Sequence, residues 1–376
     1  MAISKGELIR SWTCRDGVWQ GDPLGVHHMV LSVLGFVQEM LEYAPPDLAM
    51  DEHQTSRLVT AVHVTIADDL TQVVRRRHVL QLARWMIRTA PKYGMRLNLS
   101  KWQIYMPRHR HEHDVTQLAL CHTLQAMGSK VSSEGLDRLL GAPIGRMHFC
   151  VANGGQLDKV ADKAVSYVKA IDNLHKPHAQ YGMLLWSASQ SMTHLARLVP
   201  PAVLAGFSIR LRDALWEAVQ SLLTLQQLTH QQRTLIALPI REGGLGLTSA
   251  YEVMIPAYIA SHGSVIRELK KTRWPESAAV ARVVVGKTAL EDCIDQFNTT
   301  KREAPRPIKC DLLDSARPDL WPTQKILSSA MHHMRADEYE EELIATNRAA
   351  AGLFVSWRRE GAGDFLRVIH SLHTFS

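Results

Sequence analysis

The stretch Ile66-Ala67-Asp68-Asp69-Leu70 sets two adjacent carboxylates between two apolar segments. The segment before it, Val62-His63-Val64-Thr65-Ile66, and the segment after it, Leu70-Thr71-Gln72-Val73-Val74, are rich in the β-branched residues typical of strands. The pattern predicts a strand, a two-residue acidic turn and a second strand, which together make a hairpin.

Two carboxylates side by side at a turn repel each other, and a divalent cation would cancel that repulsion. Mg²⁺ and Mn²⁺ prefer oxygen ligands, so Asp68 and Asp69 are candidate ligands for either ion. Aspartate is also common in turns, because its side chain hydrogen-bonds the local backbone. On local grounds a metal site and an ordinary turn both stay open.

The composition is that of a globular protein with ample core: 376 residues, 46% hydrophobic and 21% charged. No apolar run approaches the ~18 residues that a membrane span needs. Residues 1–12 lack the apolar region of a secretory signal, and the five cysteines are scattered, as is typical of free thiols. We therefore expect an intracellular protein, in the nucleus or the cytoplasm, with no membrane partner.

Positive charge is concentrated directly after the acidic turn. The formal net charge is +6, and the stretch from Arg75 to Arg110 holds ten Lys or Arg and no Asp or Glu. Solvated surfaces usually mix both signs, so a one-sided block favours phosphate contacts, although a basic surface without a ligand is the alternative. The candidate nucleic-acid contacts are Arg77, Arg84 and Arg88, which share one face of a predicted amphipathic helix, and Arg96.

The order of predicted elements indicates an α+β fold followed by a mainly helical region. A helix is predicted over 26–43, with an apolar stripe that includes Val33, Leu34 and Val37. The hairpin, a helix over 76–90 and a strand over Lys101–Met106 follow. Further helices are predicted over 157–171, 183–198, 202–226, 256–271 and 324–346. Residues 298–322, rich in proline and charge, are the expected linker.

Four more segments stand in a fixed order around the acidic turn. They are Gly17-Val18-Trp19-Gln20-Gly21-Asp22-Pro23-Leu24-Gly25, Gly94-Met95-Arg96-Leu97-Asn98-Leu99-Ser100-Lys101, Leu139-Leu140-Gly141-Ala142-Pro143-Ile144-Gly145 and Leu238-Pro239-Ile240-Arg241-Glu242-Gly243-Gly244-Leu245-Gly246-Leu247. The ordered set resembles reverse transcriptases of non-LTR-type retrotransposons, read from the middle of the polymerase domain onward. The resemblance covers residues 14–250.

The resemblance implies that Asp68 and Asp69 are metal ligands in nucleotidyl transfer by two Mg²⁺ or Mn²⁺ ions, which stabilise the attacking 3′-oxygen and the leaving pyrophosphate. It implies that the loop of Gln20, Gly21 and Asp22 lies against the incoming nucleotide and the template. Taken locally, this loop is also a good helix start, with Asp22 as N-cap before a proline.

Two further sites follow from the resemblance. Lys101 would neutralise or protonate the leaving pyrophosphate, and a solvated lysine at a strand edge is the alternative. Leu140 and Gly141, inside the segment Leu139–Gly145, would grip the primer end, and an ordinary Gly/Pro turn is the alternative. The glycines of residues 243–246 lack a following Gly-Lys-Ser/Thr, so they predict an interhelical loop rather than a phosphate loop.

On this basis we expect a partial polymerase palm, made of the acidic hairpin and helices, followed by a mostly helical thumb and a C-terminal helical region. The expected segments are a partial palm (1–115), a primer-grip-like hairpin region (116–146), a helical thumb or connection (147–297), a linker (298–322) and a C-terminal helical segment (323–376). The implied partners are an RNA template, a DNA primer and dNTP.

The resemblance also implies a third carboxylate on a strand well before the Gln20 segment. Only 19 residues precede Gln20, so we expect the fingers and that strand to be missing, with an upstream segment needed to complete the site. The expected function is a fragment of an RNA-directed DNA polymerase that is inactive alone. A non-catalytic nucleic-acid-binding remnant is the alternative, and an unrelated helical scaffold is a third possibility.

Overall fold

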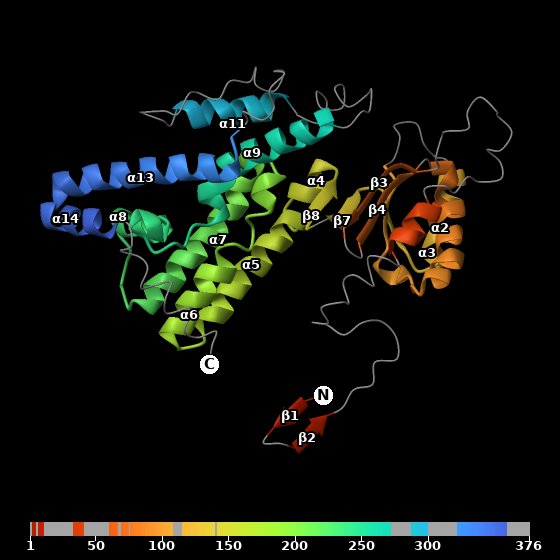
Figure 1. The fold of residues 1–376 in the computed structure, drawn as a ribbon, viewed down its shortest axis with the longest axis horizontal. Helices are drawn as coiled ribbons and strands as arrows, with labels where there is room; N and C mark the ends of the chain where they lie inside the picture. The colour runs from red at the N-terminus through yellow and green to blue at the C-terminus, as the bar shows by residue number, and fades with distance from the viewer. Residues whose placement is uncertain are drawn as a thin grey trace. The chain divides into compact units, whose positions relative to one another are not determined.

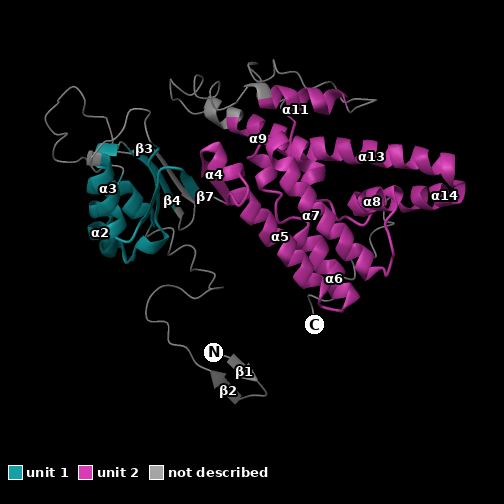
Figure 2. Ribbon diagram, turned by 180° about the vertical axis from the view of Figure 1, so that it is seen from behind, with its two compact units in different colours: residues 1–136 teal, residues 137–376 magenta. Residues whose placement is uncertain are grey.

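The computed structural model describes residues 2–4, 7–10, 33–40, 60–66, 69–74, 76–107, 115–139, 141–271, 287–299 and 322–358 (Figure 1). The chain divides into two compact units, residues 1–136 and 137–376 (Figure 2). The described part is mainly helical with a few short strands, an α+β composition as predicted. None of the helices in these ranges is long and apolar enough to cross a lipid bilayer.

The first unit combines short strands with two longer helices. Its elements are β1 (Ala2–Ser4), β2 (Glu7–Arg10), a helix over 33–40, β3 (Thr60–Ile66), β4 (Asp69–Val74), the 3-10 turn η2 (Arg76–His78), α2 (Val79–Thr89), η3 (Ala90–Tyr93), η4 (Leu99–Lys101), β5 (Gln103–Tyr105), α3 (Val115–Ala126) and β6 (Lys130–Ser132). β1 pairs with β2 antiparallel, and β5 pairs with β6 in parallel. β7 (Gly135–Leu139), within which the division between the units falls, pairs with β8 (Ala142–Gly145).

The hairpin predicted around the acidic pair is confirmed as β3 and β4, which run antiparallel. Ile66 is the register partner of Asp69, so two residues connect the strands, and both lie outside the described part. A two-residue connection suits the right-handed twist of paired strands. Asp69 therefore begins β4, whereas the sequence had predicted it within the turn.

An apolar cluster packs the helix over 33–40 against α2 and β4. Its buried members are Val33, Phe36, Val37, Met40, Leu82, Trp85, Met86 and Ala90, with Leu70 and Val74 of β4 packed against them. Phe36 stacks on Trp85 with ring centroids 5.6 Å apart. The predicted stripe is wrong at Leu34, which is 50% exposed, because Phe36 and Met40 occupy the core side of this helix.

The amphipathic helix predicted over 76–90 is confirmed by η2 and α2. Leu82, Ala83 and Met86 are buried on one side, as expected. The predicted strand over Lys101–Met106 is shorter, because η4 includes Lys101 and β5 begins at Gln103. Its expected apolar face is present, since Trp102, Ile104 and Met106 belong to one cluster with Leu124 of α3.

The second unit is built from helices. Its elements after β8 are α4 (Met147–Val151), α5 (Gln156–Asp172), α6 (Pro177–Met183), the π-helix η5 (Leu184–Ala188), η6 (Leu195–Arg197), α7 (Pro201–Leu222), α8 (His230–Ala237), η7 (Ile240–Glu242), α9 (Ala250–Lys271), α11 (Lys287–Thr299), α13 (Gln324–Thr346) and α14 (Arg348–Trp357). The main core holds the apolar stripe of α5, including Leu157, Ala161 and Ile171, against Leu204 and Leu211 of α7. The helices predicted over 157–171, 202–226 and 324–346 are confirmed.

Two predicted helices differ from the structure. The helix over 183–198 is broken, because the Ser189 amide donates to the Leu184 carbonyl in π-helical fashion and the Ser189 hydroxyl donates to Leu185. The helix predicted from Pro256 begins at Ala250 instead, and Pro256 lies inside it. The predicted linker over 298–322 falls almost entirely outside the described residues.

Candidate nucleic-acid interface

The hairpin fixes the backbone position of one member of the acidic pair. Asp69 is the first residue of β4, next to Leu70, which packs into the apolar cluster with α2. Asp68 and the side chain of Asp69 lie outside the described part, as do Gln20, Gly21 and Asp22. Adjacent carboxylates at such a hairpin are hard oxygen donors, so this donor set fits Mg²⁺ or Mn²⁺. Among the residues that the structure describes, no group of three acidic, His or Cys side chains could hold a metal.

The basic residues predicted to meet nucleic acid lie exposed on and after α2. Arg77, Arg84, Arg88 and Arg96 are all exposed. Arg77 donates to the neighbouring His78 ring at 2.9 Å. Arg84, Arg88 and Arg96 have neither an ion pair nor a side-chain hydrogen bond within the described ranges, so their guanidiniums are available to an anion. We call these three residues, two on α2 and Arg96 after η3, the α2 basic face.

Two lysines of this unit differ in their surroundings: Lys92 has an acidic partner, and Lys101 is exposed. Lys92 pairs with Glu39 at 3.4 Å, and Tyr93 donates to the same carboxylate at 2.6 Å. The Tyr93 hydrogen bond, followed by the charge of Lys92, lowers the pKa of Glu39 and keeps it anionic. Lys101 is exposed at the end of η4, so its ammonium is accessible to a ligand.

The predicted primer-grip turn has a fixed backbone in the second unit. Leu140 lies outside the described part, and Gly141 separates β7 from β8 with φ at +89°, a conformation that favours glycine. The Gly141 carbonyl lies 2.9 Å from Nε2 of His194, and a Cβ at this position would meet the same ring at 3.1 Å. Gly141 therefore serves a close contact with the segment before η6, which sequence reasoning did not foresee.

The glycine-rich segment of residues 238–247 is the interhelical loop that the sequence predicts. It folds back on the end of α8, where the amides of Leu245 and Leu247 donate to Leu235 and Ile236 at 3.0 and 3.1 Å. The Gly246 amide donates to the Leu238 carbonyl at 2.8 Å. These bonds satisfy helix-end carbonyls that would otherwise lack partners, so the loop fixes where α8 ends.

Sequence reasoning missed a second cationic group, in the helical unit. Arg212 and Trp216 of α7, Arg233 of α8, and His332 and Arg335 of α13 line one cavity of about 380 Å³. Tyr251 and Glu252, in the first turn of α9, complete the wall. We call this cavity the arginine pocket. Its residues are far apart in the sequence, so no local pattern indicates that they meet.

One part of the arginine pocket did carry a sequence signal. Ser249 and Glu252 stand in the Ser-x-x-Glu pattern typical of a helix start, and the Glu252 side chain makes its half of a capping box at α9. The Ser249 amide donates to Glu252 Oε2 at 2.7 Å, and the Ser249 hydroxyl donates to the same oxygen at 2.5 Å. This Ser-x-x-Glu pattern indicates a helix start at Ala250 rather than at Pro256.

Comparison with models of known protein families and with curated proteins found no match to this chain.

Proposed function

We propose that this chain is part of a reverse transcriptase of the non-LTR type, comprising a palm segment with the acidic hairpin and a helical thumb. In this proposal the intact site joins dNTP to a DNA primer on an RNA template. The chain on its own binds nucleic acid and does not extend a primer.

The packing around the hairpin is the observation that carries the proposal. The helix over 33–40 follows the Gln20 segment in the chain, and Phe36 and Met40 share one buried cluster with Leu70 and Val74 of β4. The resemblance requires the Gln20 segment and the acidic pair to serve one nucleotide. The helix that follows the first motif and the strand that follows the second therefore share one core, and this packing supports the proposal.

The chemistry assigned to the site rests on charge. Divalent ions stabilise the attacking and leaving oxygens in nucleotidyl transfer, and Asp68 and Asp69 would supply two of their carboxylate ligands. Lys101 would neutralise the pyrophosphate, and the α2 basic face would hold backbone phosphates.

A non-catalytic nucleic-acid-binding protein is the second candidate, and one observation favours it. The α2 basic face binds phosphate without any metal, since its three guanidiniums are exposed and lack acidic partners in the described part. This function would survive the loss of the carboxylates.

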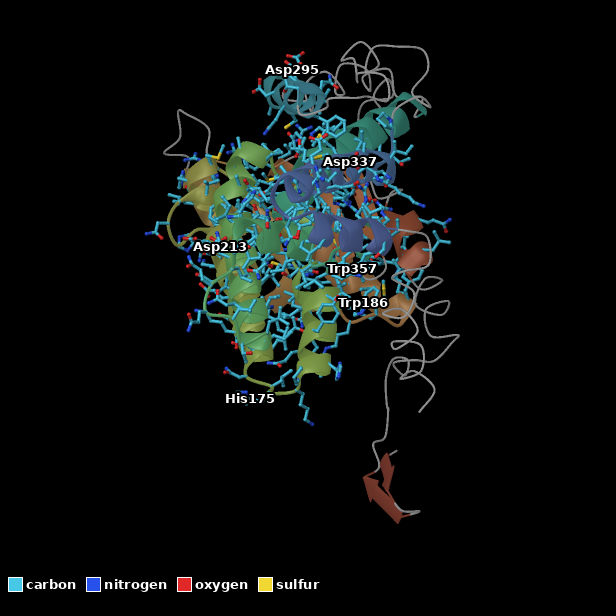
Figure 3. The ribbon with its side chains drawn as sticks, turned by 90° about the vertical axis from the view of Figure 1, so that its left-hand side faces the viewer. His175, Trp186, Asp213, Asp295, Asp337 and Trp357 are labelled. Carbon is cyan, nitrogen blue, oxygen red and sulfur yellow. The ribbon has the colours of Figure 1, made fainter. Side chains whose placement is uncertain are left out.

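The test combines primer extension with binding to a labelled primer–template. We expect no synthesis with Mg²⁺ or Mn²⁺. We also expect that changing Asp68 and Asp69 together to Asn leaves binding unchanged or stronger, because negative charge near phosphate is removed. The matched control changes Asp292 and Asp295 to Asn, both exposed on α11 (Asp295 is labelled in Figure 3).

Robust synthesis that the Asp68 and Asp69 changes abolish would make the chain an active polymerase by itself and overturn the inactive assignment. Failure to bind any primer–template at low salt would overturn both candidates and favour a helical scaffold.

A further inference from the structure

The arginine pocket contains a guanidinium stacked between two aromatic rings. The Arg212 guanidinium carbon lies 4.2 Å from the ring centroid of Trp216 and 4.4 Å from that of Tyr251. Arg233 lies over Trp216 as well, at 5.0 Å. Guanidiniums fixed on aromatic faces lose less freedom when they bind an anion, so the pocket is prepared for one.

The charges of the pocket are unequal. Arg212 forms an ion pair at 3.0 Å with Asp213, which does not line the pocket (Asp213 is labelled in Figure 3). Arg233 and Arg335 have neither an ion pair nor a side-chain hydrogen bond in the described part of the chain. The one lining carboxyl, Glu252, is 5% exposed and accepts both Ser249 hydrogens, and burial raises its pKa. The charge of Arg335 acts on Glu252 without forming an ion pair or a hydrogen bond with it. The donor groups of Arg233 and Arg335 are therefore open to a ligand.

His332 provides an independent indication of a ligand. Its side chain lines the pocket and is 7% exposed, yet its Nδ1 atom is buried with no hydrogen-bond partner in the described part. Buried polar atoms are normally paired, because leaving one unpaired is unfavourable. A ligand oxygen in the pocket would supply the missing partner.

We propose that the arginine pocket binds the phosphate monoester of a nucleotide, either a free mononucleotide or the terminal phosphate of a nucleic-acid strand. A phosphate can accept from the guanidiniums of Arg233 and Arg335, whose donor groups have no partner in the described part, and arginine binds phosphate oxygens in a bidentate manner. The choice of a nucleotide over other phosphate esters rests on the proposed function.

The shape of the surroundings suits this ligand. Ala237 and Leu238 give the pocket an apolar wall beside its charges, which accommodates the nucleoside. A second cavity of about 360 Å³ shares His230 and Arg233 with the pocket. This second cavity provides room for the nucleotides that follow the terminal phosphate of a strand.

Calorimetry with adenosine 5′-monophosphate, and with adenosine as the control ligand, tests the pocket directly. We expect the monophosphate to bind and adenosine to bind at least about tenfold more weakly, because the charged contacts are lost. Changing Arg335 to Gln should weaken binding about tenfold or more. The same change at the exposed Arg348 of α14, outside the pocket, should leave it intact. Changing Arg335 to Lys keeps the positive charge, so this protein should bind the monophosphate better than the Arg335→Gln protein. That result would show that lost charge, and not misfolding, weakens binding.

Two further measurements complete the test. Anisotropy compares a 5′-phosphorylated strand with the same strand ending in a hydroxyl. A preference of about tenfold, lost in the Arg335→Gln protein, assigns the ligand to a strand end, whereas monophosphate binding without this preference assigns it to a free nucleotide. In NMR spectra the His332 ring signals should shift when the monophosphate is added.

No binding of monophosphate or phosphorylated strand, or equal binding by the Arg335→Gln and wild-type proteins, would overturn the pocket assignment. Those results leave primer–template binding through the α2 basic face untouched, so the two proposals fail separately.

Discussion

The carboxylate of Glu242 lies 3.0 Å from Nδ1 of His333, and this contact joins the glycine-rich loop to α13. Arg358, at the end of α14, approaches the same carboxylate at 3.7 Å and also pairs with Asp337 at 2.8 Å. The Glu242 side chain is only 3% exposed. The loop thus caps α8 through its backbone and anchors α13 through one buried side chain, so that both helices are fixed where they border the arginine pocket.

Changing Glu242 to Gln should therefore lower stability. Arg241 and Arg358, whose nitrogens lie 3.5 and 3.7 Å from this carboxylate, would lose a buried counter-charge. Because the Arg241 and Arg358 side chains are 43% and 19% exposed, we expect a loss of roughly 2–3 kcal/mol, less than for a wholly buried pair. Urea unfolding measures the change, with the exposed Glu338→Gln as control. Equal stability of the two variants would show that the carboxylate is not an anchor.

Two glycine substitutions should have opposite effects. A Cβ on Gly244 would overlap the carbonyl oxygen of Leu238, so Gly244→Ala should cost roughly 3 kcal/mol. Gly206 lies in α7 with open space where a Cβ would stand, so Gly206→Ala should stabilise by about 0.5–1 kcal/mol. Thermal unfolding monitored by circular dichroism distinguishes them. Destabilisation by both would indicate that the contact at Leu238 is not the cause.

The α2 basic face makes a prediction about salt. Changing Arg84, Arg88 and Arg96 together to Gln should weaken binding to a primer–template. It should also reduce the slope of log K against log salt by about 2.1–2.7 if each guanidinium meets one phosphate. Binding titrations over a series of salt concentrations measure this slope.

The matched control removes three exposed charges from α5 by changing Lys159, Lys163 and Lys169 to Gln. It should leave the slope nearly unchanged. An equal reduction in both proteins would mean that net charge, and not the α2 basic face, governs binding.

Local sequence patterns predicted the elements whose residues are close together in the chain. The β3–β4 hairpin and the amphipathic helix α2 follow from alternation and from 3.6-residue periodicity, which depend on neighbours alone. The helix around Phe36 was predicted with the wrong face at Leu34, because burial there depends on the partner Trp85. Periodicity does not identify the partner of a helix.

The candidate sites divide in the same way. The residues of the acidic pair and of the α2 basic face lie close together in the sequence, so their residue types alone indicate a candidate site. The arginine pocket joins Arg212, Arg233 and Arg335, which three separate helices bring together, and only the fold reveals it. The break after Met183 was also missed, because it depends on hydrogen bonds of Ser189 that compete with the helix.

The buried imidazole of His332 predicts a pH dependence of stability. Burial, and then the charges of Arg335, Arg241 and His333, lower the pKa of His332 from 6.5 to about 4. Below pH 6.5 the His332 imidazole is protonated in the unfolded chain and still neutral in the native protein. The free energy of unfolding therefore decreases as the pH falls from 6.5 toward 4. The full difference is roughly 3 kcal/mol, and His332→Gln should lack this part of the loss.

Urea unfolding of both proteins across this pH range isolates the effect of His332, because every other titrating group is common to them. His178→Gln, at an exposed position of α6, controls for the substitution itself. If the stability difference between wild type and His332→Gln were constant from pH 7 to pH 4, the imidazole would not be held neutral by burial. A phosphate monoester in the arginine pocket should reduce the difference, because an anion beside His332 favours the protonated ring.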